Sequence, residues 1–186
     1  MVVSTGRWYR PAMGMRNYLI EGGSGTGKTS VCKELQRRGY RAINGDRELA
    51  YQGDPETGKP TPGLVHDPSA VFTHEHHIWN VEKVENMVAS QDRSVTFFCG
   101  HSRNVSKFVD LFDGVFILDT DLDTVNQRIS ERVALDPTDW GATPAERELI
   151  ARLHQTKEGI PGKGVTIDAT RPLHQVVDEI LARCQR

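Results

Sequence analysis

The run Gly22–Thr29, which reads Gly-Gly-Ser-Gly-Thr-Gly-Lys-Thr, has the residue types and spacing of a phosphate-binding loop. Its glycines let successive backbone N–H groups turn toward one anion, and the helix that follows adds its dipole and unpaired donors. We expect Lys28 to contact the β- and γ-phosphates of a nucleotide and the Thr29 hydroxyl to bind Mg²⁺. The other residues expected at the nucleotide are Gly23, Ser24, Gly25, Thr26, Gly27 and Ser30.

The neighbouring segments favour this interpretation over a glycine-rich turn that merely links a strand to a helix. Residues 17–21 form a short apolar run typical of a buried strand. Residues 30–38 place Val31 and Leu35 four positions apart, as an amphipathic helix requires, and Gly39 suits its C-terminal cap. A dinucleotide-binding loop is a poorer match, because the G-x-G-x-x-G pattern is missing.

A second chemically capable residue, Asp46, follows the strand predicted at residues 40–44. A carboxylate at the end of a strand beside a phosphate-binding loop is placed to orient or deprotonate an acceptor hydroxyl. The alternative is a plain turn residue beside Gly45.

The rest of the chain alternates strands with helices, which predicts an α/β fold with a parallel sheet covered by helices on both faces. Strands are expected at 17–21, 40–44, 94–99, 115–118 and 165–167. Helices are expected at 30–38, at 73–90, from the Gly100 loop to Leu111, after Asp121, from Thr143 (with a Thr143/Glu146 capping box) and near the C-terminus. Residues 52–70 have the turn chemistry of a long loop. Ligands of such a sheet sit at the C-terminal ends of its strands.

Composition narrows the class of protein. The 186 residues suit one domain, and the net charge of −2 gives no basic patch for nucleic acid. No apolar run approaches the length of a membrane span, and the first residues lack the apolar core of a signal peptide. Three widely spaced cysteines imply neither a disulfide framework nor a zinc motif, so we expect a cytoplasmic protein.

With these motifs in place, the chain resembles the small P-loop kinases: shikimate kinase, gluconate kinase and the nucleoside monophosphate kinases. The resemblance covers residues 15–186 and leaves 1–14 as a loose leader. It implies a three-layer fold with a five-stranded parallel sheet in the order 2-3-1-4-5, an acceptor-binding segment near 46–90 and a helical lid near 128–156. It also implies ATP and Mg²⁺ as cofactors and a small-molecule acceptor. The residues that match lid or adenine-loop positions of the family are Arg128, Arg132, Arg171 and Pro172.

The chain departs from the family where the strand at 94–99 ends. Many P-loop proteins carry a metal-supporting carboxylate there, but this strand ends in Cys99-Gly100. We therefore expect Thr29, with help from Asp46, to hold Mg²⁺. The next residues, through Arg103, replace the Asp-Gly-Phe-Pro-Arg segment of adenylate kinase, which disfavours a nucleoside monophosphate substrate. We expect Arg103 to neutralise charge during transfer; a solvated helix residue is the alternative.

The sequence leaves several alternatives open. His74 and His77 are expected on one helix face, where zinc binding is less favoured than a surface or substrate-pocket role because no third ligand is evident. The favoured function is ATP-dependent phosphoryl transfer to a small hydroxylated or anionic metabolite. Its rivals are a nucleoside or nucleotide kinase and a nucleotide-binding switch with slow hydrolysis. The acceptor and the oligomeric state are not readable from the sequence.

Overall fold

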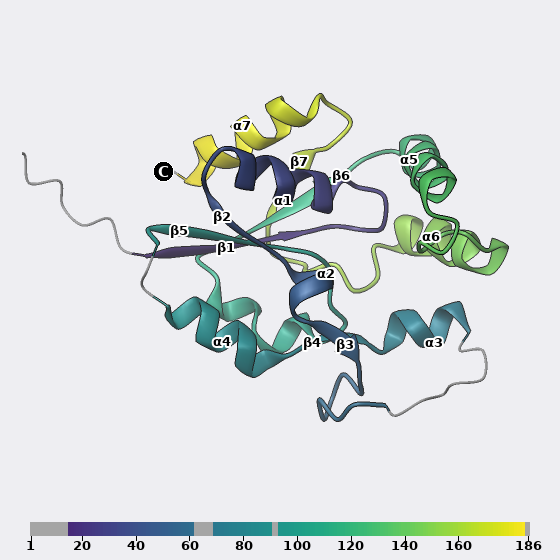
Figure 1. The fold of residues 1–186 in the computed structure, drawn as a ribbon, viewed down its shortest axis with the longest axis horizontal. Coiled ribbons are helices and arrows are strands. Elements are labelled where there is room, and N and C mark those ends of the chain that lie inside the picture. The colour runs from purple at the N-terminus through teal and green to yellow at the C-terminus, as the bar shows by residue number, and fades with distance from the viewer. Residues whose placement is uncertain (1–14, 62–68, 91–92, 185–186) are drawn as a thin grey trace, which may run out of the picture.

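A computed structural model describes residues 15–61, 69–90 and 93–184; the predicted leader lies outside these ranges. Five parallel strands form the main sheet: β1 (Arg16–Glu21), β2 (Arg41–Asn44), β5 (Val95–Cys99), β6 (Gly114–Asp119) and β7 (Val165–Asp168). Their spatial order is β2-β5-β1-β6-β7 (Figure 1). The α/β class is confirmed. Counting only the strands of this sheet gives 2-3-1-4-5; the chain numbering differs because two short strands of a second sheet intervene.

Helices cover both faces of the sheet (Figure 1). Helices α1 (Lys28–Arg37) and α7 (Leu173–Cys184) pack on one face, over Tyr18 and Ile20 of β1. Helix α4 (Val81–Ala89) lies on the other face, where Leu19 of β1 and Phe98 of β5 join a second core cluster. Because side chains alternate along a strand, β1 contributes to both cores and carries Glu21 on the face of Leu19.

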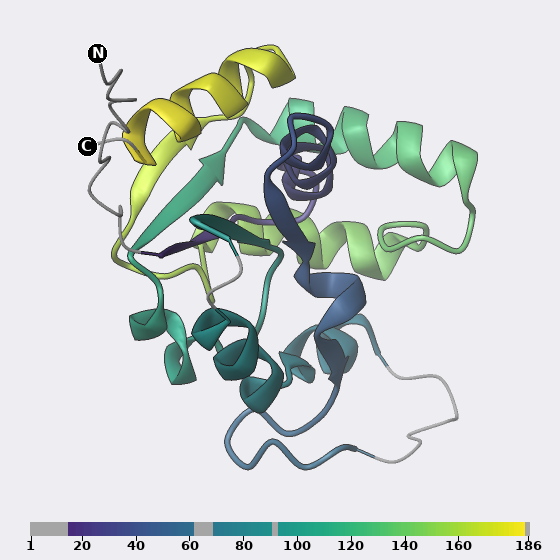
Figure 2. The same cartoon turned by 60° about the vertical axis from the view of Figure 1, so that its left-hand side comes forward.

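Two long helices, α5 (Leu122–Leu135) and α6 (Pro144–Thr156), occupy the predicted lid and lie side by side (Figures 1 and 2). They share a small hydrophobic cluster of Val125, Ile129 and Ile150 that is distinct from the two clusters against the sheet. The capping box of Thr143 and Glu146 forms at the start of α6. No helix in the described part of the chain has both the length and the apolarity to cross a membrane.

The single helix predicted at 73–90 is wrong. The chain instead forms α3 (Ala70–Glu75), the strand β4 (His77–Trp79) and then α4. Strand β4 pairs antiparallel with β3 (Ala50–Gln52), which ends where the predicted long loop begins. Trp79 is fully buried, and the Asn80 side chain accepts a hydrogen bond from the Lys83 N–H to begin α4. His77 is therefore not on the helix of His74, and their expected shared helix face does not exist.

Two further expectations need correction. The helix predicted from the Gly100 loop to Leu111 is a pair of 3₁₀ turns, Val105–Lys107 and Val109–Leu111. The predicted loop at 52–70 has partial order, because Gly53 bridges to Pro60; residues 62–68 lie outside the described ranges. Between β2 and β3 the chain also makes a short helix, α2 (Gly45–Glu48), which carries Asp46.

Candidate active site

The phosphate-binding loop connects β1 to α1, as predicted. Gly25 and Gly27 have φ angles of 79° and 103°, a region that favours glycine. The Lys28 ammonium is buried and donates to the backbone oxygens of Gly22 (2.6 Å) and Gly23 (2.9 Å). Thr29 and Ser30 are exposed in the first turn of α1. The loop therefore has the backbone freedom and the lysine of a phosphate cradle, which fits a nucleotide.

Helix α5 packs directly on this loop. A Cβ atom at Gly25 would lie 3.0 Å from Val125 Cγ1, so glycine is needed for this close approach. Arg128 donates to the Thr26 carbonyl (3.2 Å) and to the Ala169 carbonyl (2.8 Å). Arg128 thus ties the phosphate-binding loop to the segment that follows β7.

Asp46 lies beside the loop lysine. Its Oδ1 accepts a hydrogen bond from the His101 N–H (2.9 Å) and lies 3.4 Å from His77 Nε2. Burial raises the pKa of Asp46, but the His77 hydrogen bond, the Lys28 charge and the His101 N–H outweigh burial and leave this pKa below its usual value. A Cβ at Gly100 would lie 2.5 Å from Asp46 Oδ1, so this glycine admits the carboxylate. Asp46 is therefore held as a carboxylate close to Lys28.

Two residues that the sequence analysis missed, Glu21 and His101, also meet here. Glu21 Oε1 accepts the Gly22 N–H (3.1 Å) and lies 2.8 Å from His101 Nδ1. Through its side chain and its backbone, His101 contacts both Glu21 and Asp46. The only signal in the sequence was an acidic residue at the end of an otherwise apolar strand, directly before Gly22.

The histidines gather around this centre without forming a metal site. The His74 ring stacks on the His101 ring, with centroids 5.4 Å apart and planes 4° apart. Burial, with the electrostatic influence of His101 and Arg103, lowers the pKa of His74 to about 3. Among the described residues, no group of three or more His, Cys, Asp or Glu side chains is arranged to hold a metal ion.

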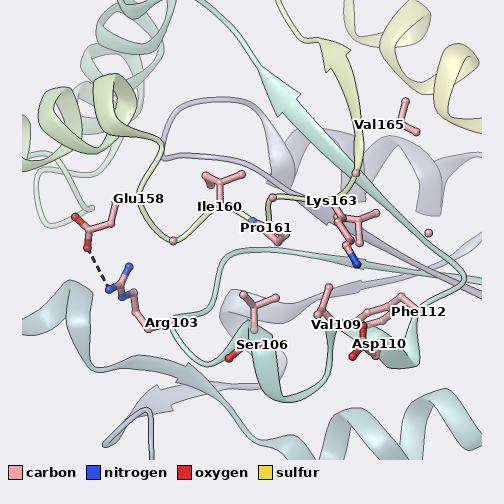
Figure 3. Close-up of a pocket in the computed structure, with 16 residues that line it drawn as sticks. Arg103, Ser106, Val109, Asp110, Phe112, Glu158, Ile160, Pro161, Lys163 and Val165 are labelled. Carbon is pink, nitrogen blue, oxygen red and sulfur yellow. Dashed lines mark hydrogen bonds and ion pairs between the residues drawn. The ribbon is translucent and has the colours of Figure 1, made fainter.

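Arg103 lies in the loop after β5 rather than on a helix. Its backbone N–H donates to the His77 carbonyl (3.0 Å), and its side chain pairs with Glu158 (3.2 Å), just after α6. Arg103 also lines one end of a cavity of about 980 Å³ that runs between the 3₁₀ turns and residues 158–165 (Figure 3). A Cβ at Gly159 would meet both Arg103 and His101, so the loop after α6 rests on the site.

The remaining predicted site residues are Arg132, Arg171 and Pro172, and their contacts are made outside the phosphate-binding loop. Arg132 pairs with Asp139 (3.2 Å) and donates to the Trp140 carbonyl, so it braces the turn between α5 and α6. Arg171 pairs with Glu179 of α7, and Pro172 comes directly before that helix. Within the described part of the chain, neither arginine forms a hydrogen bond with the phosphate-binding loop.

Comparison with known proteins supports the same fold. A sequence profile described as an AAA domain matches residues 19–153. No curated protein sequence matches the chain. A shikimate kinase from Acinetobacter baumannii is similar in structure, with a TM-score of 0.61, 15% identity and coverage of 93% of this chain and 94% of that one.

Two other solved structures are similar over most of both chains. A gluconokinase from Sinorhizobium meliloti has a TM-score of 0.51 and 20% identity, and the match covers 93% of this chain and 92% of that one. A deoxyadenosine kinase from M. mycoides, with bound dATP, has a TM-score of 0.52 and 13% identity, covering 92% and 100%. All three are small P-loop kinases, and at these identities the likeness establishes the fold.

Proposed function

Because the chain belongs to the AAA domain family and has a kinase-like P-loop fold, we propose that it transfers the γ-phosphoryl group of ATP to a hydroxyl group of a small metabolite. One observation carries this proposal. The Asp46 carboxylate is fixed by the His101 N–H, 2.9 Å away, and lies close enough to Lys28 for the lysine charge to lower its pKa. A loop that binds phosphate and a carboxylate that can orient a hydroxyl therefore face the same space.

We assign each residue of the site a separate role in such a transfer. The loop amides and Lys28 would bind the β- and γ-phosphates, and Thr29, with help from Asp46, would hold a Mg²⁺ ion, which would supply positive charge beside those phosphates. Asp46 orients the acceptor oxygen toward the γ-phosphorus and takes the hydroxyl proton. The new P–O bond forms as the bond to the bridging oxygen of ADP breaks. Arg128, which donates to the Thr26 carbonyl of the loop, and Arg103 neutralise charge during the transfer, and Arg132, Arg171 and Pro172 support the lid and adenine regions.

The surroundings of His74 favour an acceptor that carries negative charge. Two arginines, Arg103 and Arg152, lie close enough to the His74 ring to help lower its pKa. A carboxylate or phosphate group on the acceptor would be attracted to these two arginines, while its hydroxyl met Asp46. We infer that the acceptor is a small hydroxylated anion bound between α3 and the lid.

Release of ADP, measured with ATP, Mg²⁺ and a library of hydroxylated metabolites, tests the proposal. The library includes sugar acids, cyclic hydroxy acids, nucleosides and nucleotides. We expect acceptor-dependent turnover with a hydroxylated anion. Turnover with nucleosides or nucleotides only would favour a nucleoside or nucleotide kinase. Tight nucleotide binding with slow hydrolysis that no acceptor stimulates would favour a nucleotide-binding switch and overturn the proposal.

A further inference from the structure

One oxygen of the Glu21 carboxylate has no partner inside the protein. The Glu21 side chain is 1% exposed, and its Oε2 atom is buried with no hydrogen bond. The other oxygen, Oε1, is held by the Gly22 N–H (3.1 Å) and His101 Nδ1 (2.8 Å). Placing a carboxylate out of water is unfavourable unless both of its oxygens are satisfied. A fixed carboxylate with one unused oxygen is therefore suited to a ligand.

The position of Glu21 identifies the kind of ligand. Strands β1 and β5 pair in the register Ile20 to Cys99, and the Gly100 N–H donates to the Ile20 carbonyl (3.1 Å). Glu21 thus extends β1 just beyond the level at which β5 ends in Cys99, where a metal-supporting carboxylate was expected and is missing. It also directly precedes the first glycine of the phosphate-binding loop. Glu21 therefore places a carboxylate on the strand next to β5, at the same edge of the sheet.

We propose that Glu21 is the carboxylate that holds Mg²⁺ in the nucleotide complex, with Oε2 binding a water of the metal's hydration shell. This inference rests on the proposed function, because it requires a bound nucleotide. Mg²⁺ prefers oxygen ligands, keeps several of its waters and commonly uses one or two carboxylates with substrate phosphates. Gly22 and His101 orient Oε1, as the hydrogen-bonded neighbours of metal-binding carboxylates do.

Asp46 is the competing candidate, and the contacts distinguish the two. Asp46 Oδ1 is engaged by the His101 N–H and His77, on the side of the acceptor segment. Glu21 adjoins the phosphate-binding loop itself. No complete protein-made metal cluster exists among the described residues, which agrees with a metal held mainly by phosphates and water. Glu21 is therefore the main carboxylate that supports the metal, and Asp46 acts mainly on the acceptor.

Calorimetric titration of a non-hydrolysable ATP analogue, with Mg²⁺ and with a chelator, tests this division. In the parent protein Mg²⁺ should strengthen binding. In Glu21→Gln most of that strengthening should be lost, about 10–100-fold in affinity, which is the usual effect of disturbing a metal's supporting shell. Binding without Mg²⁺ should be equal or tighter, because a negative charge beside the phosphates is removed. Asp113→Asn is the matched control, since Asp113 accepts the Asn17 N–H (2.7 Å) at the opposite end of β1.

The outcomes separate the two proposals. If the parent protein binds no ATP analogue, or binds it equally well with and without Mg²⁺, the proposed function itself fails. If the parent shows a Mg²⁺ effect and Glu21→Gln keeps it in full, or alters only the KM of the acceptor, the assignment of Glu21 to the metal is wrong. Should Glu21→Gln not fold, His101→Gln carries the test: it keeps the backbone bond to Asp46, releases Oε1 and should weaken the Mg²⁺ effect alone.

Discussion

At the scale of single residues, Lys28 has the largest expected effect on the nucleotide. Its ammonium already lies against two carbonyls of the phosphate-binding loop, so it needs little movement to reach a phosphate. Lys28→Ala should weaken ATP binding and lower turnover by about 10²–10³-fold, the usual loss for removing one group that stabilises transferred charge. Lys33→Ala, an exposed lysine on the same helix, is the control. A folded Lys28→Ala protein with unchanged affinity and turnover would contradict the assignment of this loop.

Asp46 should act on the acceptor rather than on ATP. Asp46→Asn keeps the size of the side chain but removes the charge, so it should retain most ATP affinity and lose about 10²–10⁴-fold in turnover if the carboxylate is a general base. A smaller loss would indicate an orienting role, because a loose transition state demands little of a base. Steady-state turnover and analogue binding measure the two effects, with the exposed Asp110→Asn as control. Wild-type turnover in Asp46→Asn would remove Asp46 from the site.

At the scale of elements, α3 and the neighbouring lid helix create a pH dependence through His74. Its pKa falls from 6.5 to about 3 because the ring is buried and faces His101, Arg103, His77 and Arg152. Between these values the unfolded chain binds a proton at His74 that the folded protein does not bind, so stability falls as the pH is lowered through this range. Above about pH 6.5 the effect vanishes.

Urea unfolding near pH 7 and near pH 5 measures this effect. The parent protein should lose more stability between the two conditions than His74→Phe, which keeps a ring against His101 but has no titrating group. Equal losses in both proteins would show that His74 is not the origin of the pH dependence.

The elements also explain what the sequence predicted and what it did not. The strand–loop–helix around Lys28 was predictable because the motif and the periodicity agree. The segment 73–90 was not, because Ile78 sits at helical spacing from Val81 while belonging to a short buried strand, and periodicity does not distinguish these cases. Glu21 and His101 were missed for a different reason. Their contact depends on the pairing of β1 with β5, and the order of residues in the sequence does not show which strands are neighbours.

At the scale of the whole molecule, the predicted lid has its own small core. Helices α5 and α6 share the cluster of Val125, Ile129 and Ile150, separate from both sheet cores. At its C-terminal end the lid is fixed by two ion pairs, Lys157 with Asp119 (2.7 Å) and Glu158 with Arg103 (3.2 Å). An element with a separate core and exposed polar attachments can open at lower cost than the sheet that carries it.

We expect this lid to close over ATP and exclude water that would otherwise accept the phosphoryl group. Amide hydrogen exchange at residues 136–155 should slow when an ATP analogue and Mg²⁺ are added, while exchange in β1 and β5, which lie in the core, should stay unchanged and serve as the internal reference. Because Arg128 already joins the phosphate-binding loop to α5, ordering the loop with nucleotide should also order the helix that follows. Equal exchange with and without nucleotide would mean that these two helices are a fixed part of the fold, and the exclusion of water would then have to come from the acceptor segment alone.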